Sequence, residues 1–380
     1  MDTLGSSEAS ANNYQIVVNG IGTASASLFS ALKQAISLPE AEIARRILQA
    51  PSTLISKVNK DTAEKIRELL NNSGLDSQIL LETEQLKEGT GDHEIALVIS
   101  SFKDIHKILP QLIQITGLST ETAITLLNKN PTVFLGNISE VTAKTIQKRF
   151  LELGIETDIS KPKSALYDMA INAENHTVQQ HVESLLNEKG LSFKVSQQQT
   201  SKLYSINEIS YEEANDAWQK SIERKIPCEL MNQDYQRYDI ELDQINDQNK
   251  EDIKSYLIQS LGIPEKVVNR VISSVPVVVA KHKTLSDTRN ILSSLTELNC
   301  LAKAELVSSL TFNIQIESLP ENGQAQHIFS QLLGLREATI NQIIQGRTQL
   351  IEGPFSYNQA RWAQYEFQKI GGKARLIKRQ

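Results

Sequence analysis

The sequence predicts an α+β protein of five tandem small two-layer domains, each with the element order β-α-α-β-α-β. Three recurring features predict this class. A small residue followed by Leu or Ile returns at spacings of 80, 73, 72 and 72 residues, at Ser37, Gly117, Gly190, Gly262 and Gly334. A helix-ending Gly or Asn follows 37 residues later in four copies, at Gly74, Gly154, Asn299 and Gly371. The third feature is an apolar stripe on the last helix of four copies, which Ser221 and Arg224 interrupt in the third copy.

The second copy shows the first half of the domain most clearly. Residues 94–100 predict an apolar strand, and residues 103–116 predict a helix with apolar residues at spacings of three and four. Gly117 ends that helix because glycine adopts positive φ without steric cost. Ser119 or Thr120 then caps a second helix, which Pro131 stops.

The second half of this copy begins with a short strand at residues 133–135. Ser139 caps a third helix, and Gly154 ends it before a last strand at residues 155–159. The buried stripe predicted on this helix consists of Ala143, Ile146, Phe150 and Leu153.

The same signals recur in the other copies, although the third is eroded. The stripe returns as Ala63/Ile66/Leu70, Thr288/Ile291/Leu295 and Ala360/Ala363/Phe367. The stop before the short strand is Pro51, Pro131 and Pro276, with Thr348 in copy five and Tyr204 in copy three. In copy three, residues 193–202 are rich in Gln and Ser where the second helix belongs, and no glycine stands near Lys225.

These signals give the domain boundaries. We expect repeat domains at 14–83, 94–160, 165–232 (degenerate), 235–309 and 311–380, after a disordered polar tail at 1–13. The polar, glycine-containing segment 84–93 predicts a flexible linker. The later linkers are short, so copies two to five are expected to hold fixed orientations while the first copy swings.

Composition restricts the class of partner and the compartment. The net charge of -6 argues against nucleic acid as the main partner, and no apolar run is long enough to predict a membrane span. The two cysteines, Cys228 and Cys300, do not form a disulfide framework. We expect a cytoplasmic protein.

Residues 115–160, ITGLSTETAITLLNKNP…ISEVTAKTIQKRFLELGIETDIS, resemble the C-terminal domain of the bacterial ribosomal stalk protein. The N-degron adaptor of the Clp protease is similar in fold. The resemblance implies the two-layer fold. In the stalk family the first helix carries basic residues that engage translational GTPases, and of the corresponding positions here only Lys33 keeps a basic group. A ribosomal stalk role is therefore not expected.

Motifs of enzymes and metal sites are missing from the sequence. There is no phosphate-binding glycine loop, no dinucleotide fingerprint and no His-Glu-x-x-His. His176 and His181 are five apart, which does not place them on one helix face for a metal. We therefore expect no catalytic residue, cofactor or metal. A pocket lined by His176, His181 and Glu183 would be the sign of the enzyme alternative.

Aromatic and basic residues supply the interface candidates. Trp218 and Trp362 lie on third helices, with Trp362 off the core stripe and therefore predicted to be exposed. Packing between copies and contact with a partner both fit these residues. The full set is Trp218, Trp362, Tyr211, Tyr357, Lys373, Arg375, Lys378 and Arg379, the last four on a terminal strand where basic residues typically prevent edge pairing.

Together these features predict a non-enzymatic interaction scaffold, or a structural or adaptor subunit of a larger bacterial or phage-type assembly. Helix faces and sheet edges of successive copies would bind protein partners, and tethering would add weak contacts together. Self-association is also compatible with the sequence. The alternative is a substrate-delivery adaptor or chaperone resembling the Clp adaptor.

Overall fold

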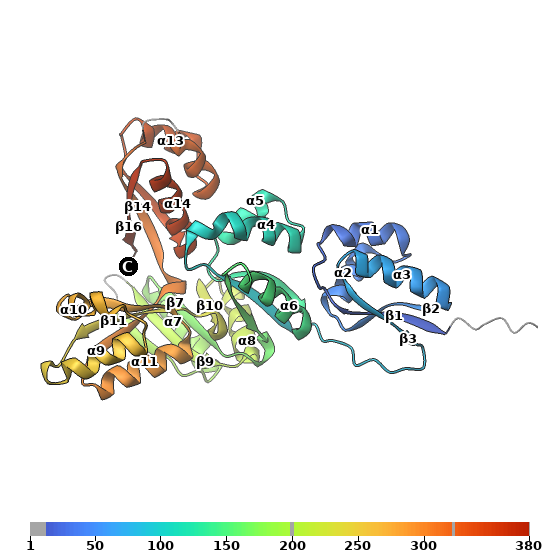
Figure 1. Ribbon diagram of the computed structural model, residues 1–380. Helices are drawn as coiled ribbons and strands as arrows, with labels where there is room; N and C mark the ends of the chain where they lie inside the picture. Colours follow the sequence, from blue (N-terminus) through green and yellow to red (C-terminus); the bar gives the residue numbers. More distant parts are fainter. Residues whose placement is uncertain (1–12, 198–200, 321–323, 380) are drawn as a thin grey trace, which may run out of the picture. The chain divides into compact units, whose positions relative to one another are not determined.

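The computed structural model describes residues 13–197, 201–320 and 324–379, which hold fourteen helices and sixteen strands in five antiparallel sheets (Figure 1). Each predicted copy contains one sheet, so the α+β class is confirmed, and the copies are called repeats 1 to 5. Contacts divide the chain into two compact units. The first extends through Leu126 and includes Thr132–Lys161, and the second contains Leu127–Pro131 and the chain from Pro162. The predicted tail at 1–13 lies outside the described residues except for Asn13.

Repeat 1 has the predicted element order. The strands form a sheet in the order β2-β1-β3, and the three helices lie together on one side of it (Figure 1). The elements are β1 (Tyr14–Gly20), α1 (Ser27–Ala35), α2 (Glu40–Leu48), β2 (Ser52–Val58), α3 (Lys60–Asn72) and β3 (Asp76–Leu81).

Repeat 2 repeats this topology with the strand order β5-β4-β6. Gly117 ends the first helix at φ 72°, and the Ser139 hydroxyl caps the third by accepting a hydrogen bond from the N–H of Thr142, both as predicted. Leu153 is 36% exposed and follows the end of the third helix, so its assignment to the buried stripe was wrong. The elements are β4 (His93–Val98), η1 (Phe102–Asp104), α4 (Ile105–Thr116), α5 (Thr120–Leu127), β5 (Thr132–Ile138), α6 (Glu140–Leu151) and β6 (Glu156–Ser160).

Repeat 3 departs from the predicted order because a strand replaces the second helix. Its order is β-α-β-β-α-β, and the extra strand β8 extends the sheet to β10-β7-β9-β8. The Gln- and Ser-rich sequence here has no apolar helical stripe, whereas pairing with β9 satisfies its backbone. Tyr204 lies buried within β9 rather than before it. The elements are η2 (Pro162–Ser164), β7 (Tyr167–Ala173), α7 (His176–Glu188), β8 (Lys194–Gln197), β9 (Lys202–Ile209), α8 (Tyr211–Glu223) and β10 (Cys228–Asn232).

Repeats 4 and 5 return to three-stranded sheets, in the orders β12-β11-β13 and β15-β14-β16. Repeat 4 comprises η3 (Gln233–Tyr235), β11 (Tyr238–Gln244), η4 (Asp247–Asn249), α9 (Lys250–Gln259), α10 (Glu265–Ser273), β12 (Val277–Lys283), α11 (Leu285–Glu297) and β13 (Leu301–Leu306). Repeat 5 comprises η5 (Val307–Ser309), β14 (Thr311–Ser318), α12 (Ala325–His327), a π-helical turn (Ile328–Leu332), α13 (Glu337–Ile344), β15 (Leu350–Ser356), α14 (Tyr357–Lys369) and β16 (Lys373–Lys378).

The predicted helix ends recur in the backbone. The markers at Gly74, Gly154, Asn299 and Gly371 all have positive φ, and in repeat 3 Lys225 takes the same left-handed conformation without a glycine. Pro51, Pro131 and Pro276, which were predicted to stop the second helix, each follow a cis peptide bond. The stripe predicted on the third helix of repeat 5 is buried at all three positions, Ala360, Ala363 and Phe367.

The segment between repeats 1 and 2 has no helix or strand after β3, but part of it lies against repeat 1. The N–H of Gly89 donates to the carbonyl of Pro51 at 2.7 Å. The Gln49 amide donates to the carbonyl of Asn137 at 3.2 Å, which joins the two repeats within the first unit. We expect these contacts to restrict the predicted swing of repeat 1, and the flexibility of this linker stays a prediction.

Candidate interaction site

A left-handed residue precedes the third helix in four repeats and forms the turn from which the site is built. It is the second residue before the N-cap, with φ between 53° and 60°, at Lys57, Asn137, Glu208 and His282. A side chain on the first strand accepts a hydrogen bond from this turn: Asp168 from the Glu208 N–H at 2.9 Å and Asp239 from the His282 N–H at 3.0 Å. In repeat 5, Asn313 accepts from Gly353 at 2.7 Å.

The turn of repeat 3 contacts repeat 4 within the second unit. Asp168 Oδ1 accepts from the side-chain amide of Gln233, and its Oδ2 accepts from that of Gln236, both at 2.7 Å. Gln236 has no exposed surface, so only the carboxylate and neighbouring protein groups are available to its amide. Gln236 Oε1 in turn accepts a hydrogen bond from the Tyr238 hydroxyl at 2.7 Å. Asp168 therefore holds both the turn and the connection to repeat 4.

An ion pair between Glu208 and Arg289 completes this contact. Glu208 is the left-handed residue of repeat 3, and Arg289 lies on α11 of repeat 4. Both side chains are more than half exposed, so solvent screens the pair and its contribution to stability is small. Burial, followed by the nearby Asp168 carboxylate, raises the pKa of Tyr238, which keeps its hydroxyl protonated at neutral pH.

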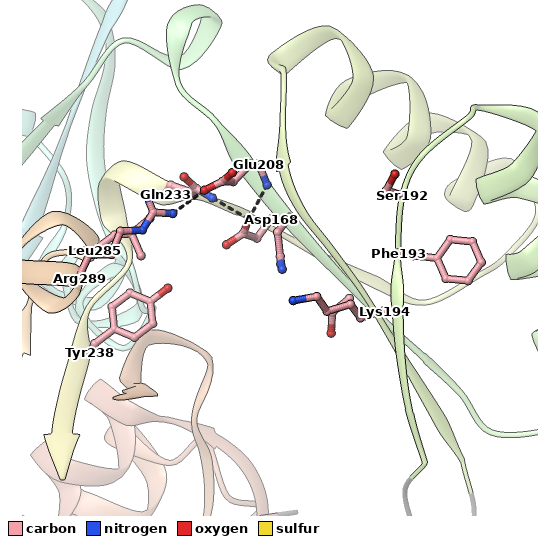
Figure 2. A pocket seen from close by; sticks show the side chains of 11 residues that line it. Asp168, Ser192, Phe193, Lys194, Glu208, Gln233, Tyr238, Leu285 and Arg289 are labelled. Atoms are coloured by element: carbon pink, nitrogen blue, oxygen red, sulfur yellow. Dashed lines mark hydrogen bonds and ion pairs between the residues drawn. The ribbon is translucent and has the colours of Figure 1, made fainter. Parts of the chain in front are cut away.

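These residues surround a pocket of about 610 Å³ between repeats 3 and 4. Figure 2 shows Asp168, Glu208, Gln233 and Arg289 joined by hydrogen bonds and an ion pair, with Tyr238 beside them. The Lys194 side chain reaches from β8 into the pocket, whereas the Phe193 ring points the other way (Figure 2). The lining is completed by Ser192, Ser205, Asn207 and Leu285.

The contact between repeats 4 and 5 is built on the same turn. His282 Nε2 lies 3.2 Å from the hydroxyl of Tyr357, the first residue of α14, and the two rings meet edge to face with centroids 5.4 Å apart. The Arg361 guanidinium carbon lies 5.4 Å from the centroid of the Tyr357 ring. Burial lowers the pKa of His282, so the imidazole is neutral at pH 7. Tyr357 and Arg361 in repeat 5 match Leu285 and Arg289 in repeat 4, counted from the N-cap.

Of the predicted aromatic candidates, only Trp218 is clearly exposed, at 37%. Trp362 is 5% exposed, so the prediction that it lies on the surface was wrong: this face of α14 is covered as well as the core stripe. Tyr211 is half-buried, with its ring centroid 6.0 Å from that of Tyr167. Tyr357 is buried in the contact between repeats 4 and 5. Whether Trp218 binds a partner stays a prediction.

The basic candidates lie on and after the edge strand β16. The structure does not gather them into one site: Lys378 forms an ion pair with Glu305 of repeat 4, and Arg379 donates its backbone N–H to Thr311. Lys373 and Arg375 are exposed. Their interface role stays a prediction.

The residues named for the enzyme alternative do not line the pocket. His176 and His181 are exposed on α7, and Glu183 accepts a hydrogen bond from the buried Tyr204 hydroxyl at 2.6 Å. Within the described part of the chain, no three His, Cys, Asp or Glu side chains gather as metal ligands. None of the described helices combines the length and apolar character needed to cross a bilayer.

Sequence reasoning did not find Asp168, Lys194, Tyr238 or Arg289. A weak signal exists, because an aromatic residue followed by Asp or Asn opens the first strand of three repeats: Tyr167-Asp168, Tyr238-Asp239 and Phe312-Asn313. Searches with the sequence found no matching protein-family model and no matching characterised protein. The resemblance to the stalk domain therefore rests on the residues quoted above.

Proposed function

We propose that this chain is a non-enzymatic interaction scaffold, serving as a structural or adaptor subunit of a larger bacterial or phage-type assembly and binding protein partners in the cytoplasm. The observation that carries the proposal is the recurrence of one contact. The left-handed turn of one repeat meets the third helix of the next, through Glu208 and Arg289 and again through His282 and Tyr357. Repeats joined this way present their outer faces in a defined order, which suits a scaffold.

An exposed apolar pair on repeat 3 supports the proposal. Trp218 is 37% exposed and Ile222, one turn further along α8, is 53% exposed. Residues four apart lie on the same helix face, and an exposed Trp beside an aliphatic residue is a frequent anchor of protein interfaces. On α8 this pair lies beside the stripe of buried residues formed by Ala214, Ala217 and Ser221, at the edge of the face that packs on the core.

The test is affinity capture of the full chain from its native extract, with the mass ratio of the captured proteins measured. The scaffold predicts one dominant partner at a fixed ratio and loss of that partner with the W218A/I222A double variant. The matched control is I344A, because Ile344 is also exposed, at 43%, but lies on α13 of repeat 5.

The other outcomes separate the competing functions. Many clients at low ratio, together with a protease, would support the substrate-delivery adaptor, for which the pocket between repeats 3 and 4 offers a peptide-sized site. Turnover of a small molecule by the purified chain would contradict a non-enzymatic role. Equal capture by the double variant would exclude α8 as the docking face.

A further inference from the structure

The pocket between repeats 3 and 4 lies on the sheet face that the helices of repeat 3 leave open. Along β9, Tyr204 and Ile206 are buried in the core, whereas Ser205 and Asn207 alternate with them and line the pocket. Lys194 pairs with Ser205 across the strands and so lies on the same face. Repeat 4 forms the opposite wall with Tyr238, Leu285 and Arg289. A volume of about 610 Å³ is within the range of ligand-binding pockets.

The acidic groups of this pocket are already engaged by the protein. Asp168 accepts one backbone and two side-chain hydrogen bonds, which occupy both of its oxygens. Glu208 is paired with Arg289. A cationic ligand would therefore compete with existing partners of both carboxylates, which makes this pocket a poor site for a cation.

The donors of the pocket, in contrast, are available. The Lys194 side chain forms no ion pair or hydrogen bond with any other described residue, and its amine reaches into the pocket (Figure 2). The side chains of Ser205 and Asn207 also make no hydrogen bonds within the described part of the chain. A free ammonium group beside free hydroxyl and amide donors favours a ligand that accepts hydrogen bonds and carries negative charge.

Charge decides which anion fits. The pocket has one unpaired cation, and two carboxylates lie nearby, so a dianion such as phosphate would meet more repulsion than a carboxylate with a single charge. We propose that this pocket binds a carboxylate carried by an acidic peptide segment of a protein partner. The assignment of the carboxylate to a peptide rests on the proposed function. The preference for a carboxylate rests on the pocket alone.

The test is calorimetric titration of the full chain at low salt with an acetylated, amidated Gly-Gly-Glu-Gly-Gly-Gly peptide, which carries a single carboxylate. We expect saturable binding that weakens with added salt, and affinity about two- to fivefold lower for Lys194→Gln, since an exposed charge pair contributes a change of this size. The Gln counterpart of the peptide should not bind. Lys266→Gln is the control, because Lys266 is an exposed lysine on α10 that does not line the pocket.

Four results would overturn the inference. Equal binding of the Gln peptide would show that the carboxylate is not recognised. Equal affinity of the Lys194→Gln and Lys266→Gln variants would place the binding elsewhere. Free glutarate that binds as tightly as the peptide would make the ligand a small molecule. If Lys194→Gln captures the native partner as well as the wild-type chain does, this inference is refuted and the scaffold is not. If the wild-type chain captures no partner at a fixed ratio, the scaffold itself is refuted.

Discussion

Replacing Asp168 by Ala is predicted to loosen the contact between repeats 3 and 4. The carboxylate holds three N–H donors, from the backbone of Glu208 and the side chains of Gln233 and Gln236. Its removal leaves Gln236, which has no exposed surface, without the acceptor for its amide. Water can replace the lost acceptor more readily for Gln233 and for the turn, which are partly or fully exposed.

The magnitude follows from these exposures. An unsatisfied buried donor costs about 1–3 kcal/mol, and the two more accessible hydrogen bonds add about 0.5 kcal/mol each. The sum is about 3 kcal/mol, which corresponds to about a hundredfold increase in local opening. Asp239→Asn is the matched control: Asp239 accepts from the turn of repeat 4 at 3.0 Å, and Asn313 makes the equivalent bond in repeat 5. This control should cost about 0.5 kcal/mol or less.

Hydrogen exchange measured by mass spectrometry is the suitable assay. A chain of several domains does not unfold in one step, whereas exchange reports the opening of each segment. D168A should lower protection in β9 and in residues 233–238, and leave repeats 1 and 2 unchanged. Protection within about threefold of wild type, or an equal effect of D239N, would refute the role assigned to Asp168.

Three further outcomes are expected. Burial, followed by the hydrogen bond to Glu183, raises the pKa of Tyr204 to about 12, so repeat 3 should lose stability as pH rises from about 10 to 12. Unfolding curves measured at alkaline pH should show this loss for the wild-type chain and not for Tyr204→Phe. Burial lowers the pKa of His282, so the contact with Tyr357 should weaken as pH falls below about 6.5; an NMR titration giving His282 its usual pKa would contradict this. Phe150→Ala should lower the free energy of unfolding of repeat 2 by about 3–5 kcal/mol and expose this repeat to limited proteolysis. Leu151→Ala, at an exposed position, should do neither.

Much of the fold could be predicted from local signals. Gly117 at a helix end and Ser139 at a helix start report backbone requirements that few other residues meet, so each marks a boundary in the sequence. The stripe ending at Phe367 could be found because one buried helix face repeats every three to four residues.

The remainder depends on contacts between distant residues. Strand β8 forms because β9 is available as a partner, and its four exposed residues carry no apolar alternation that would reveal it. The exposure of Trp362 was predicted from the third-helix stripe alone, but packing outside that stripe also buries its side chain.

The candidate site could not be predicted from the sequence for a related reason. Glu208 and His282 have positive φ although neither is glycine, so nothing in the local sequence marks the turns. Asp168 and Lys194 come together only because β7, β9 and β8 are neighbours in the sheet. The sequence predicted where each repeat lies, and the contacts between repeats define the pocket.

The central claim is that the recurring turn contacts fix repeats 3 to 5 into one array. The most direct measurement is pulsed electron paramagnetic resonance between spin labels on Q219C in α8 and Q342C in α13, with Cys228 and Cys300 replaced by Ala. Both labelled positions are exposed. The claim predicts one narrow distance distribution for the free chain, broadened by combined D168A and Y357A changes, which remove one contact at each junction. A broad distribution in the unmodified array would contradict it.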